Sequence, residues 1–256
     1  MSDAEIIAAL HRGRLSGGKM SRYPGPAPRD KDHAFEIQSA VRKKLKSWKH
    51  AGWKVGCTSA KAQAALNTDG PFPGPLYENR RYKSGAYVST QDSNSRTTEP
   101  EVAFIMARDL PARDTPWSVD EALAAVKTVH PAIEVVNPRL PNGFKDVVEW
   151  YIADGALNHG IVLGTGIPPL RRDQYAKITA KVSVNGEWKY SGVASNALGG
   201  PENVLAWLAN HLNGKGLHLR AGDIVSTGVI TEVFEVNVRD EVMAVFEGLG
   251  VVSISY

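Results

Sequence analysis

The segment that decides the fold is Thr98-Glu99-Pro100-Glu101-Val102-Ala103-Phe104-Ile105-Met106. Pro100 excludes a helix interior, because proline lacks the backbone N–H that a helical turn needs. The residues that follow it favour a β-strand. Side chains two positions apart on a strand point to one face, with Cα atoms about 7 Å apart. Glu99 and Glu101 are therefore predicted to lie side by side at the start of a strand.

A third acidic residue, Glu134, lies inside the apolar run Ala132-Ile133-Glu134-Val135-Val136. An ionised carboxylate without a partner in such a strand costs several kcal/mol. Carboxylate oxygens are preferred ligands of hard divalent cations such as Mg²⁺, so Glu99, Glu101 and Glu134 predict a metal site. Two simpler interpretations stay open. The first two residues can form a solvated strand face, and Glu134 can form a buried ion pair with Arg139 or Lys145.

Length and composition indicate an ordinary globular chain. It has 256 residues, of which 43% are hydrophobic and 22% charged, enough for one large domain or two small ones. No apolar run approaches the roughly 18 to 20 residues of a membrane span, and residues 1–20 lack the apolar core of a secretory signal. The single cysteine, Cys57, excludes an internal disulfide and fits a reducing compartment. We therefore expect a cytoplasmic protein without a membrane association.

The net charge of +3 is small for this length. The most basic stretch, residues 41–49, combines cationic residues with apolar residues at helical spacing, which is typical of an amphipathic helix with a solvated face. No zinc-finger spacing or aromatic-basic motif accompanies it. We therefore expect no nucleic-acid partner.

The order of local patterns predicts an α+β fold. A mainly helical N-terminal region over residues 1–70 precedes a mixed-β catalytic domain over residues 71–256. In the first region we expect helices near 3–13 and 31–49, a strand over 53–58 and a brief helix that Ser59 caps and that runs through Ala65. Residues 68–75 hold three prolines and two glycines and predict a loop.

Strands dominate the second region. Alternating or apolar runs predict strands at 86–89, 100–107, 131–136, 160–164, 177–184, 187–191, 223–227, 233–238, 242–247 and 250–255. Asn185-Gly186 between two such runs indicates a two-residue hairpin. Ser118 and Glu121 form a capping-box signature before one helix. Pro201 begins another helix, which Gly214 or Gly216 ends.

Seven segments in a fixed order carry a family resemblance. They resemble the 2-keto-4-pentenoate hydratase and 4-oxalocrotonate decarboxylase branch of the fumarylacetoacetate hydrolase superfamily, from about residue 34 to the last residue. The segments are Gly52-Trp53-Lys54-Val55-Gly56-Cys57-Thr58-Ser59, Gly74-Pro75-Leu76-Tyr77, Glu99-Pro100-Glu101-Val102-Ala103-Phe104, Pro131-Ala132-Ile133-Glu134-Val135-Val136, Ile152-Ala153-Asp154, Ala197-Leu198-Gly199-Gly200-Pro201 and Gly222-Asp223-Ile224-Val225-Ser226-Thr227-Gly228.

The resemblance implies a mixed β-roll fold, a homo-oligomer, and a Mg²⁺ or Mn²⁺ site at the positions of Glu99, Glu101 and Glu134. It also implies that Lys54 enters the active site. The substrate's carboxylate end would be bound by the turn containing Leu76 and Tyr77, and by Thr227. Relatives that cleave carbon–carbon bonds typically carry a lysine near the position of Asp154, and its absence here argues against hydrolase chemistry.

This chain departs from the family pattern at two places. Many hydratases read Asp-Asn where Asp154 is followed by Gly155. The turn in the relatives often continues into Ala-Asp, whereas here Tyr77 is followed by Glu78 and Asn79. Both departures fall near the predicted pocket, and they leave the identity of the substrate open.

The inferred substrate is a small 2-oxo acid or its dienol, such as 2-hydroxypenta-2,4-dienoate. Ketonisation of the dienol yields an α,β-unsaturated ketone whose C4 is electrophilic. Water then adds at C4 and a proton at C3, which gives a 4-hydroxy-2-oxo acid, and a metal would stabilise negative charge on the 2-oxygen. Lys54 is the preferred acid/base or carboxylate-orienting residue, because a partly desolvated lysine beside a metal is expected to have a lowered pKa. Asp154 and Glu78 are further candidates for handling water.

Other readings stay open from the sequence. The nearest rival is a decarboxylase of 2-oxo-enedioates, which would need a cation such as Arg80, Arg81 or Arg139 for the second carboxylate. An acylpyruvate hydrolase and a catalytically silent assembly subunit are further alternatives. His130 lies four positions before Glu134 on the same strand face, and it is either a partner of the metal ligands or a structural residue. The same two interpretations apply to His159. Cys57 is predicted to be a small core residue.

Overall fold

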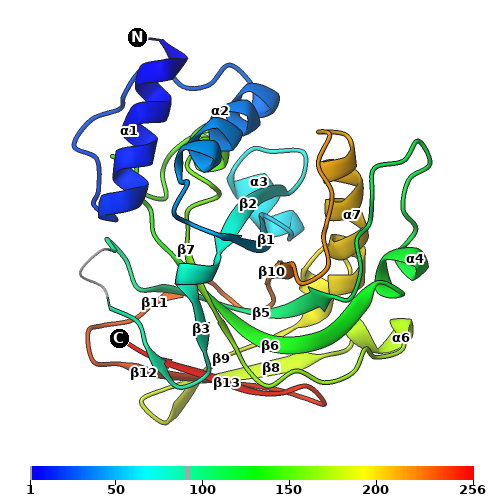
Figure 1. Cartoon of the computed structure of the whole chain (residues 1–256). Helices are drawn as coiled ribbons and strands as arrows, with labels where there is room; N and C mark the ends of the chain where they lie inside the picture. The colour runs from blue at the N-terminus through cyan, green and yellow to red at the C-terminus, as the bar shows by residue number, and fades with distance from the viewer. Residues whose placement is uncertain (1, 90–92) are drawn as a thin grey trace.

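The computed structural model describes residues 2–89 and 93–256, which form two β-sheets with helices packed around them (Figure 1). The larger, eight-stranded sheet has seven strands in one path, and β11 (Phe234–Glu235) pairs with its central strand β5. In spatial order the path runs through β2 (Phe72–Tyr77), β1 (His50–Gly56), β10 (Ile224–Val229), β5 (Thr97–Met106), β6 (Val126–Val136), β7 (Asn158–Leu163) and β3 (Arg81–Lys83).

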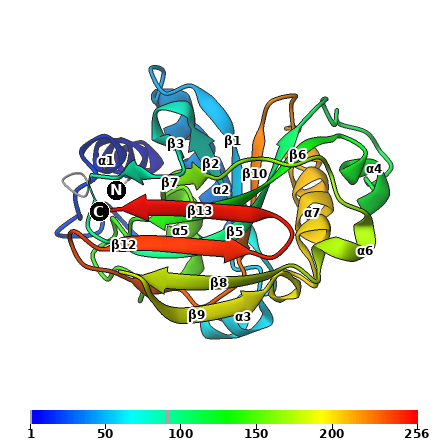
Figure 2. The same ribbon diagram turned by 90° about the horizontal axis from the view of Figure 1, so that it is seen from below.

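The smaller sheet has five strands, and Figure 2 shows its longer strands side by side on one face of the molecule. Its order is β4 (Ala86–Tyr87), β13 (Gly250–Ser255), β12 (Glu241–Phe246), β8 (Thr179–Val184) and β9 (Glu187–Val193). The predicted hairpin joins β8 to β9, and its two central residues, Asn185 and Gly186, have φ values of 53° and 81°. Asn and Gly tolerate this left-handed backbone, which matches the twist of the strands.

The helices form two groups at opposite sides of the larger sheet (Figure 1). One group lies near β1 and β2 and contains α1 (Asp3–Ser16), α2 (Lys31–Lys44), α3 (Ala60–Ala65) and α5 (Val148–Ala153). The other contains α4 (Val119–Leu123), α6 (Arg172–Tyr175) and α7 (Pro201–Asn213), and short 3-10 turns lie at Glu78–Arg80 and Ala194–Asn196. No helix in residues 2–89 and 93–256 has the length and apolar character needed to cross a membrane.

Local signals set several of these boundaries as predicted. Ser59 accepts a hydrogen bond from Ala62 N–H at the start of α3, and Ser118 and Glu121 form the expected capping box at α4. Pro201 is at the first turn of α7, where its missing N–H has no cost. Helix α2 ends at Lys44, five residues before the predicted end. The chain turns there, and Trp48 packs edge-on against Tyr77 with ring centroids 5.2 Å apart.

The predicted loop over 68–75 is wrong in its second half, because β2 starts at Phe72. Strand β2 is at the edge of the sheet, where proline is tolerated. The carbonyl of Pro73 points away from β1 and accepts a hydrogen bond of 2.9 Å from Gln38 Nε2. The backbone nitrogen of the same residue therefore also faces outward, and the missing N–H interrupts no ladder.

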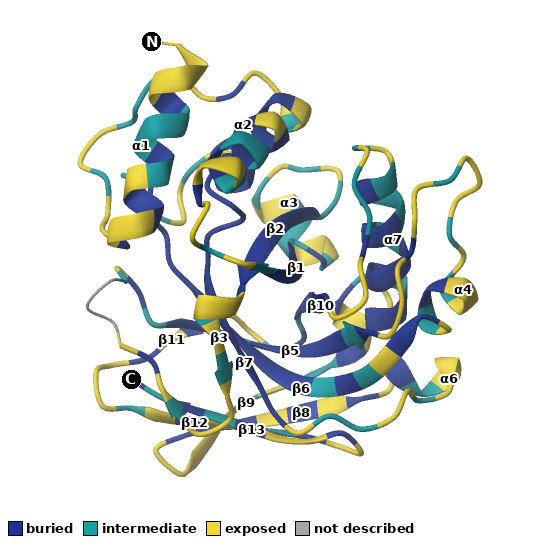
Figure 3. Cartoon of the chain, in the orientation of Figure 1, coloured by how far each residue is buried: buried dark blue, intermediate teal, exposed yellow. Residues whose placement is uncertain are grey.

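The central strands are the most deeply buried part of the molecule, as Figure 3 shows. One face of β1, β5 and β10 contributes Trp53, Val55, Phe104 and Val225 to the main apolar core. The two sheets pack against each other through β6 and β13. The α+β class and the mixed β-roll are confirmed. The division into residues 1–70 and 71–256 stays a proposal, and β1 from the first range pairs within the main sheet.

Candidate active site

Strand register brings the three acidic residues together. Strands β5 and β6 are antiparallel, and Glu99 is directly opposite Glu134. Glu101 follows two positions later on the same face, as the spacing predicts. One carboxylate oxygen from each residue lies within 4.8 Å of the other two. Like charges that face each other across strands are destabilising, so this arrangement calls for a compensating cation.

Pro100 fits the sheet because of an irregularity in the neighbouring strand. Its carbonyl accepts a hydrogen bond of 3.0 Å from Ile230 N–H, so its nitrogen also points toward β10. There the pairing between β10 and β5 shifts register between Ser226 and Val229. The missing N–H of proline therefore falls where the ladder is already interrupted.

Lys54 reaches the acidic cluster from β1. It pairs in register with Ser226 of β10, and its Nζ lies 3.1 Å from Glu134 Oε2. The second oxygen of Glu134 accepts a hydrogen bond of 2.9 Å from Asn158 Nδ2. Glu134 therefore has a cation on one oxygen and an amide donor on the other. Neither Arg139 nor Lys145, which the simpler interpretation considered as partners, forms the ion pair.

Glu101 is held from β10. One of its oxygens, Oε2, accepts a short hydrogen bond from the Ser226 hydroxyl and one of 2.9 Å from Gly228 N–H. Its other oxygen, Oε1, is buried and has no hydrogen-bond partner among the described residues. Buried polar atoms are almost always satisfied, so an unpartnered carboxylate oxygen that faces two further carboxylates fits a site for a divalent cation.

Burial and mutual repulsion shift the acidity of the cluster. Desolvation, with a contribution from the Glu134 charge, raises the pKa of Glu99 to about 7 against the opposing effect of Lys54. The pKa of Glu101 is raised well above its ordinary value, again first by desolvation and then by the charges of Glu134 and Glu99. The protein without metal therefore does not hold all three side chains ionised at neutral pH.

The three carboxylates oppose the effect of burial on the Lys54 pKa. Burial does act to lower it, but the charges of Glu134, Glu99 and Glu101 together raise the pKa above its ordinary value. A divalent cation bound by the same carboxylates would offset their charge. The depressing effect of burial would then act on Lys54 with less opposition.

A cavity of about 320 Å³ opens beside Glu99 and Lys54. Its walls are largely apolar and come from α3, β2, β6 and the segments around α5 and β10; the apolar side chains include Leu66, Phe72, Val136, Phe144, Leu157 and Val233. Thr58, Ser59 and Tyr151 add polar groups. Phe144 and Val233 are 48% and 50% exposed and mark the mouth of the cavity. The cavity has the size and polarity of a small-molecule site.

Two predicted catalytic residues lie outside this cavity. Glu78 is in a 3-10 turn at the surface, and its nearest cation is Arg81 at 3.7 Å. Asp154 is buried in an ion pair with Arg139, in which Arg139 Nη2 lies 3.0 Å from Asp154 Oδ2. Neither side chain lines the cavity or joins the acidic cluster. Their predicted role in handling water has no support from these positions.

The predicted substrate-binding residues also lie outside the cavity, with their side chains packed in the protein interior. Leu76 packs in a small apolar cluster with Ala103 and Ala132. Tyr77 lies against Trp48 and below the guanidinium of Arg14. Thr227 donates a hydrogen bond of 2.7 Å to the carbonyl of Val102. All three predicted residues are buried and absent from the cavity wall.

The remaining candidates have structural contacts. His130 contacts the carbonyl of Gly164 at 2.9 Å and the hydroxyl of Thr128 at 2.8 Å, and these contacts favour a structural role for this histidine. His159 is buried and lies 3.4 Å from Arg80. Cys57 lines the cavity, and burial raises its pKa to about 11, which disfavours the thiolate.

Sequence reasoning missed the groups that hold the acidic residues and shape the cavity. Asn158 and Ser226 are ordinary polar residues in strands, and no local pattern marks them as partners of Glu134 and Glu101. An unusual backbone conformation does mark part of the cavity wall. Gly155, Ala156 and Leu157 all have positive φ values, of 71°, 55° and 59°. Such strain in non-glycine residues concentrates at functional sites, and Ala156 and Leu157 both line the cavity.

Several known proteins resemble this chain over most of its length. A 2-hydroxyhexa-2,4-dienoate hydratase of Comamonas testosteroni is 30% identical over 207 residues, which cover 80% of this chain and 77% of that protein. A 2-keto-4-pentenoate hydratase of Burkholderia vietnamiensis is 29% identical over 261 residues, covering 100% and 97%. A 4-oxalocrotonate decarboxylase of Pseudomonas sp. is 28% identical over 222 residues, covering 86% and 83%.

Solved structures share the fold. The 4-oxalocrotonate decarboxylase from Pseudomonas putida G7, complexed with magnesium and adipate, has a TM-score of 0.89 at 24% identity, and the match covers 100% of this chain and 98% of that one. A fumarylpyruvate hydrolase from Pseudomonas aeruginosa, in complex with Mn²⁺ and pyruvate, has a TM-score of 0.61 at 18% identity, covering 81% and 88%. Residues 32–254 match the family model described as fumarylacetoacetate (FAA) hydrolase C-terminal. The resemblance drawn from the seven sequence segments is thereby confirmed, and the chain belongs to the fumarylacetoacetate hydrolase family.

Proposed function

We propose that this protein is a metal-dependent hydratase that adds water to a 2-hydroxy-2,4-dienoate and forms a 4-hydroxy-2-oxo acid. The observation that carries the proposal is the cluster of Glu99, Glu101, Glu134 and Lys54, of which Glu99 and Lys54 line an otherwise uncharged cavity. The names of the hydratase relatives support it. A site of this kind suits a substrate with one acidic end and an apolar chain.

Mg²⁺ or Mn²⁺ is the proposed cofactor, and Glu99, Glu101 and Glu134 would hold it. Oxygen-only ligands suit these hard cations, and the structures of two family members contain magnesium and Mn²⁺. The bound cation would act as a Lewis acid that favours the ionised 2-oxygen of the substrate. The carboxylates supply up to three negative charges, and Lys54 supplies one positive charge close by.

Lys54 is the proposed acid/base residue. Its Nζ lies at the boundary between the acidic cluster and the cavity, so it can reach both the substrate carboxylate and the carbon chain. We assign to Nζ the proton that is exchanged at C3. The apolar walls formed by Phe72, Val136 and Leu157 keep bulk water from the diene and orient its chain. The hydroxyls of Thr58 and Ser59 lie on the same wall and can position the attacking water.

The cavity favours this reaction over decarboxylation of a 2-oxo-enedioate. That substrate carries a second carboxylate, which would need a cationic partner at the far wall. Among the described residues that line the cavity, Lys54 is the sole cation. Arg139, which the sequence left as a candidate partner, is bound to Asp154 instead.

Incubation of the protein with Mg²⁺ and each of the two substrate types tests the proposal. We expect loss of dienol absorbance with 2-hydroxypenta-2,4-dienoate and no CO₂ release from 2-oxohex-3-enedioate. CO₂ release without hydration of the dienoate would establish the decarboxylase instead. Activity toward neither would leave a silent assembly subunit as the better reading.

Assembly and location are parts of the same proposal. Trp188, Met243 and Val251 are exposed apolar residues on the smaller sheet, which supports a homo-oligomer. Sedimentation velocity at micromolar concentration tests this, and a monomer would contradict it. The single cysteine supports a cytoplasmic location, which fractionation of the source cells tests.

A further inference from the structure

The side chain of Arg14 lies in the interior of the protein, although its helix α1 precedes the residues that match the family model. Its guanidinium donates hydrogen bonds to three backbone carbonyls that follow α5. These bonds measure 2.7 Å to Asn158, 2.9 Å to Asp154 and 3.4 Å to Gly155. All three acceptors are backbone oxygens. These bonds therefore fix the backbone path of the loop and do not pair Arg14 with an acidic side chain.

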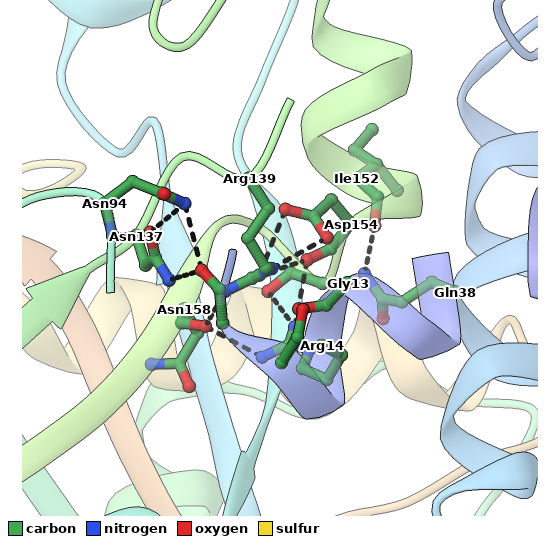
Figure 4. A network of polar contacts seen from close by, with 12 residues as sticks. Gly13, Arg14, Gln38, Asn94, Asn137, Arg139, Ile152, Asp154 and Asn158 are labelled. Carbon is green, nitrogen blue, oxygen red and sulfur yellow. Dashed lines mark hydrogen bonds and ion pairs between the residues drawn. The ribbon is translucent and has the colours of Figure 1, made fainter. Parts of the chain in front are cut away.

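A second arginine holds the same loop from the opposite side, as Figure 4 shows. Arg139 Nε donates 3.1 Å to Asp154 Oδ1, Nη2 donates 3.0 Å to the Asp154 carbonyl and Nη1 donates 3.2 Å to the Asn158 carbonyl. The carbonyl of Asn158 therefore accepts from both guanidinium groups. These contacts fix the backbone of Asn158, and Asp154 keeps Arg139 in place.

The held residue contacts a proposed metal ligand. Asn158 Nδ2 donates the hydrogen bond of 2.9 Å to Glu134 Oε1. An unbroken series of buried contacts thus joins α1 to the acidic cluster through Arg14, Asn158 and Glu134. Groups that orient a metal ligand commonly affect metal affinity by about 10- to 100-fold.

Gly155 leaves the space that the Arg14 guanidinium occupies in this series of contacts. A Cβ atom at Gly155 would lie 1.9 Å from Arg14 Nη2, so a side chain there cannot coexist with the observed guanidinium. The φ of Gly155 is +71°. This glycine is one of the two departures from the family pattern, in which many hydratases carry Asn at this position. The observed position of the Arg14 guanidinium therefore depends on glycine at residue 155.

From these contacts we propose that Arg14 and Asn158 are positioning residues for the metal centre: Arg14, with Arg139, fixes Asn158, and Asn158 orients the Glu134 carboxylate for the cation. The proposal rests on the proposed metal site. It assigns the N-terminal helix α1 a part in metal affinity, and it gives Asp154 a structural part in that arrangement instead of one in water chemistry.

The test measures the Mn²⁺ dissociation constant by electron paramagnetic resonance, on protein whose folding is checked by circular dichroism. Asn158→Leu removes the amide donor at similar volume, and Arg14→Met removes the guanidinium but keeps the apolar stem. Each change is expected to weaken Mn²⁺ binding about 10-fold or more. Gly155→Asn suits the left-handed backbone but displaces Arg14, so it is expected to weaken binding as Arg14→Met does.

A double-variant cycle and two controls separate positioning from stability. Arg14→Met combined with Gly155→Asn is expected to be no worse than Arg14→Met alone, because both act on one contact. Gln38→Leu removes two buried hydrogen bonds to the carbonyls of Pro73 and Ile152. It is expected to lower the melting temperature and leave Mn²⁺ affinity unchanged. Arg12→Met, on the exposed face of α1, is expected to change neither.

Wild-type Mn²⁺ affinity in folded Asn158→Leu would overturn this inference and leave the proposed function standing. Additive weakening in the double variant would overturn the link through Arg14. A wild-type protein that binds no Mn²⁺ would overturn the inference and the proposed metal site together.

Discussion

Glu99 and Glu134 face each other directly across two antiparallel strands in the interior of the protein, each with its carboxylate on the same face of the sheet. Opposed like charges in a buried sheet are unfavourable unless a cation or protons compensate them. Lys54 compensates one charge, and the raised pKa of Glu99 favours protonation of its carboxylate. A divalent cation would compensate the carboxylate charges without protons. The metal-free and metal-bound proteins should therefore differ in measurable ways.

Glu101→Gln should abolish turnover and weaken metal uptake while the protein stays folded. The change removes one ligand and one buried negative charge but keeps the shape of the side chain. Loss of several kcal/mol of electrostatic stabilisation corresponds to a fall in kcat/KM of about 100-fold or more. Steady-state kinetics, with Mn²⁺ titration of the same sample, measure both effects. Retained activity would remove Glu101 from the ligand set.

Lys54→Met should lower kcat by about 100-fold or more, as expected for loss of an acid/base group. Its metal affinity should not fall, because the substitution removes a cation that competes with the metal for Glu134. Kinetics at saturating Mg²⁺ together with a Mn²⁺ dissociation constant separate the two effects. Kinetics like those of the wild type would exclude Lys54 from the mechanism.

The metal-free protein should lose stability as the pH rises from about 4.5 to about 7. In the folded state Glu99 keeps its proton up to a pKa of about 7, mainly because of desolvation, whereas the ordinary value is 4.5. The unfolded chain therefore binds fewer protons in this window, and the free energy of unfolding decreases with pH. Urea denaturation at several pH values in the presence of a chelator measures this.

Magnesium should reverse that trend. Its binding requires ionised carboxylates, so it releases protons near pH 7 and becomes tighter as the pH rises through this range. Calorimetric titration in buffers of different ionisation enthalpy counts the released protons. Glu99→Gln is the matched control and should reduce the pH dependence of the metal-free protein, while the part that comes from the raised pKa of Glu101 remains. Magnesium affinity that is independent of pH between 6 and 8 would contradict the raised pKa.

Phe144→Ala should raise KM for dienoates that carry an alkyl group beyond C5, and change kcat less. Phe144 lines the mouth of the cavity while 48% exposed, so its truncation removes apolar contact with little effect on folding. One methylene of contact is worth about 1–3 kcal/mol, and a partly exposed ring should contribute at the low end, about 3- to 10-fold. Val147→Ala, equally exposed but outside this cavity, is the control. An unchanged KM for every chain length would show that the substrate does not reach the mouth.

The sequence sufficed for those parts of the site that lie within one strand or follow from the family resemblance. Pro100 and the spacing of Glu99 and Glu101 indicated a strand with two carboxylates on one face, and β5 has that arrangement. The apolar neighbours of Glu134 indicated that its charge needs a partner. Strand register then decided which partner it has, and a single sequence does not contain the register of β1, β10 and β6.

The parts that a single sequence does not supply depend on tertiary context. Asp154 has the same chemistry as a catalytic acid, but the position of Arg139, 15 residues earlier, makes it half of a buried ion pair. The prolines of β2 predicted a loop, because only the sheet order shows that β2 is an edge strand. The pKa of Lys54 depends on three carboxylates that approach from two other strands.

Anomalous diffraction from crystals soaked with Mn²⁺ and oxalate shows directly whether the three carboxylates hold a divalent cation. We expect one strong anomalous peak within bonding distance of carboxylate oxygens from Glu99, Glu101 and Glu134, with oxalate chelated on the side that faces the cavity. An ion bound elsewhere, or no ion between these three side chains at saturating Mn²⁺, would contradict it.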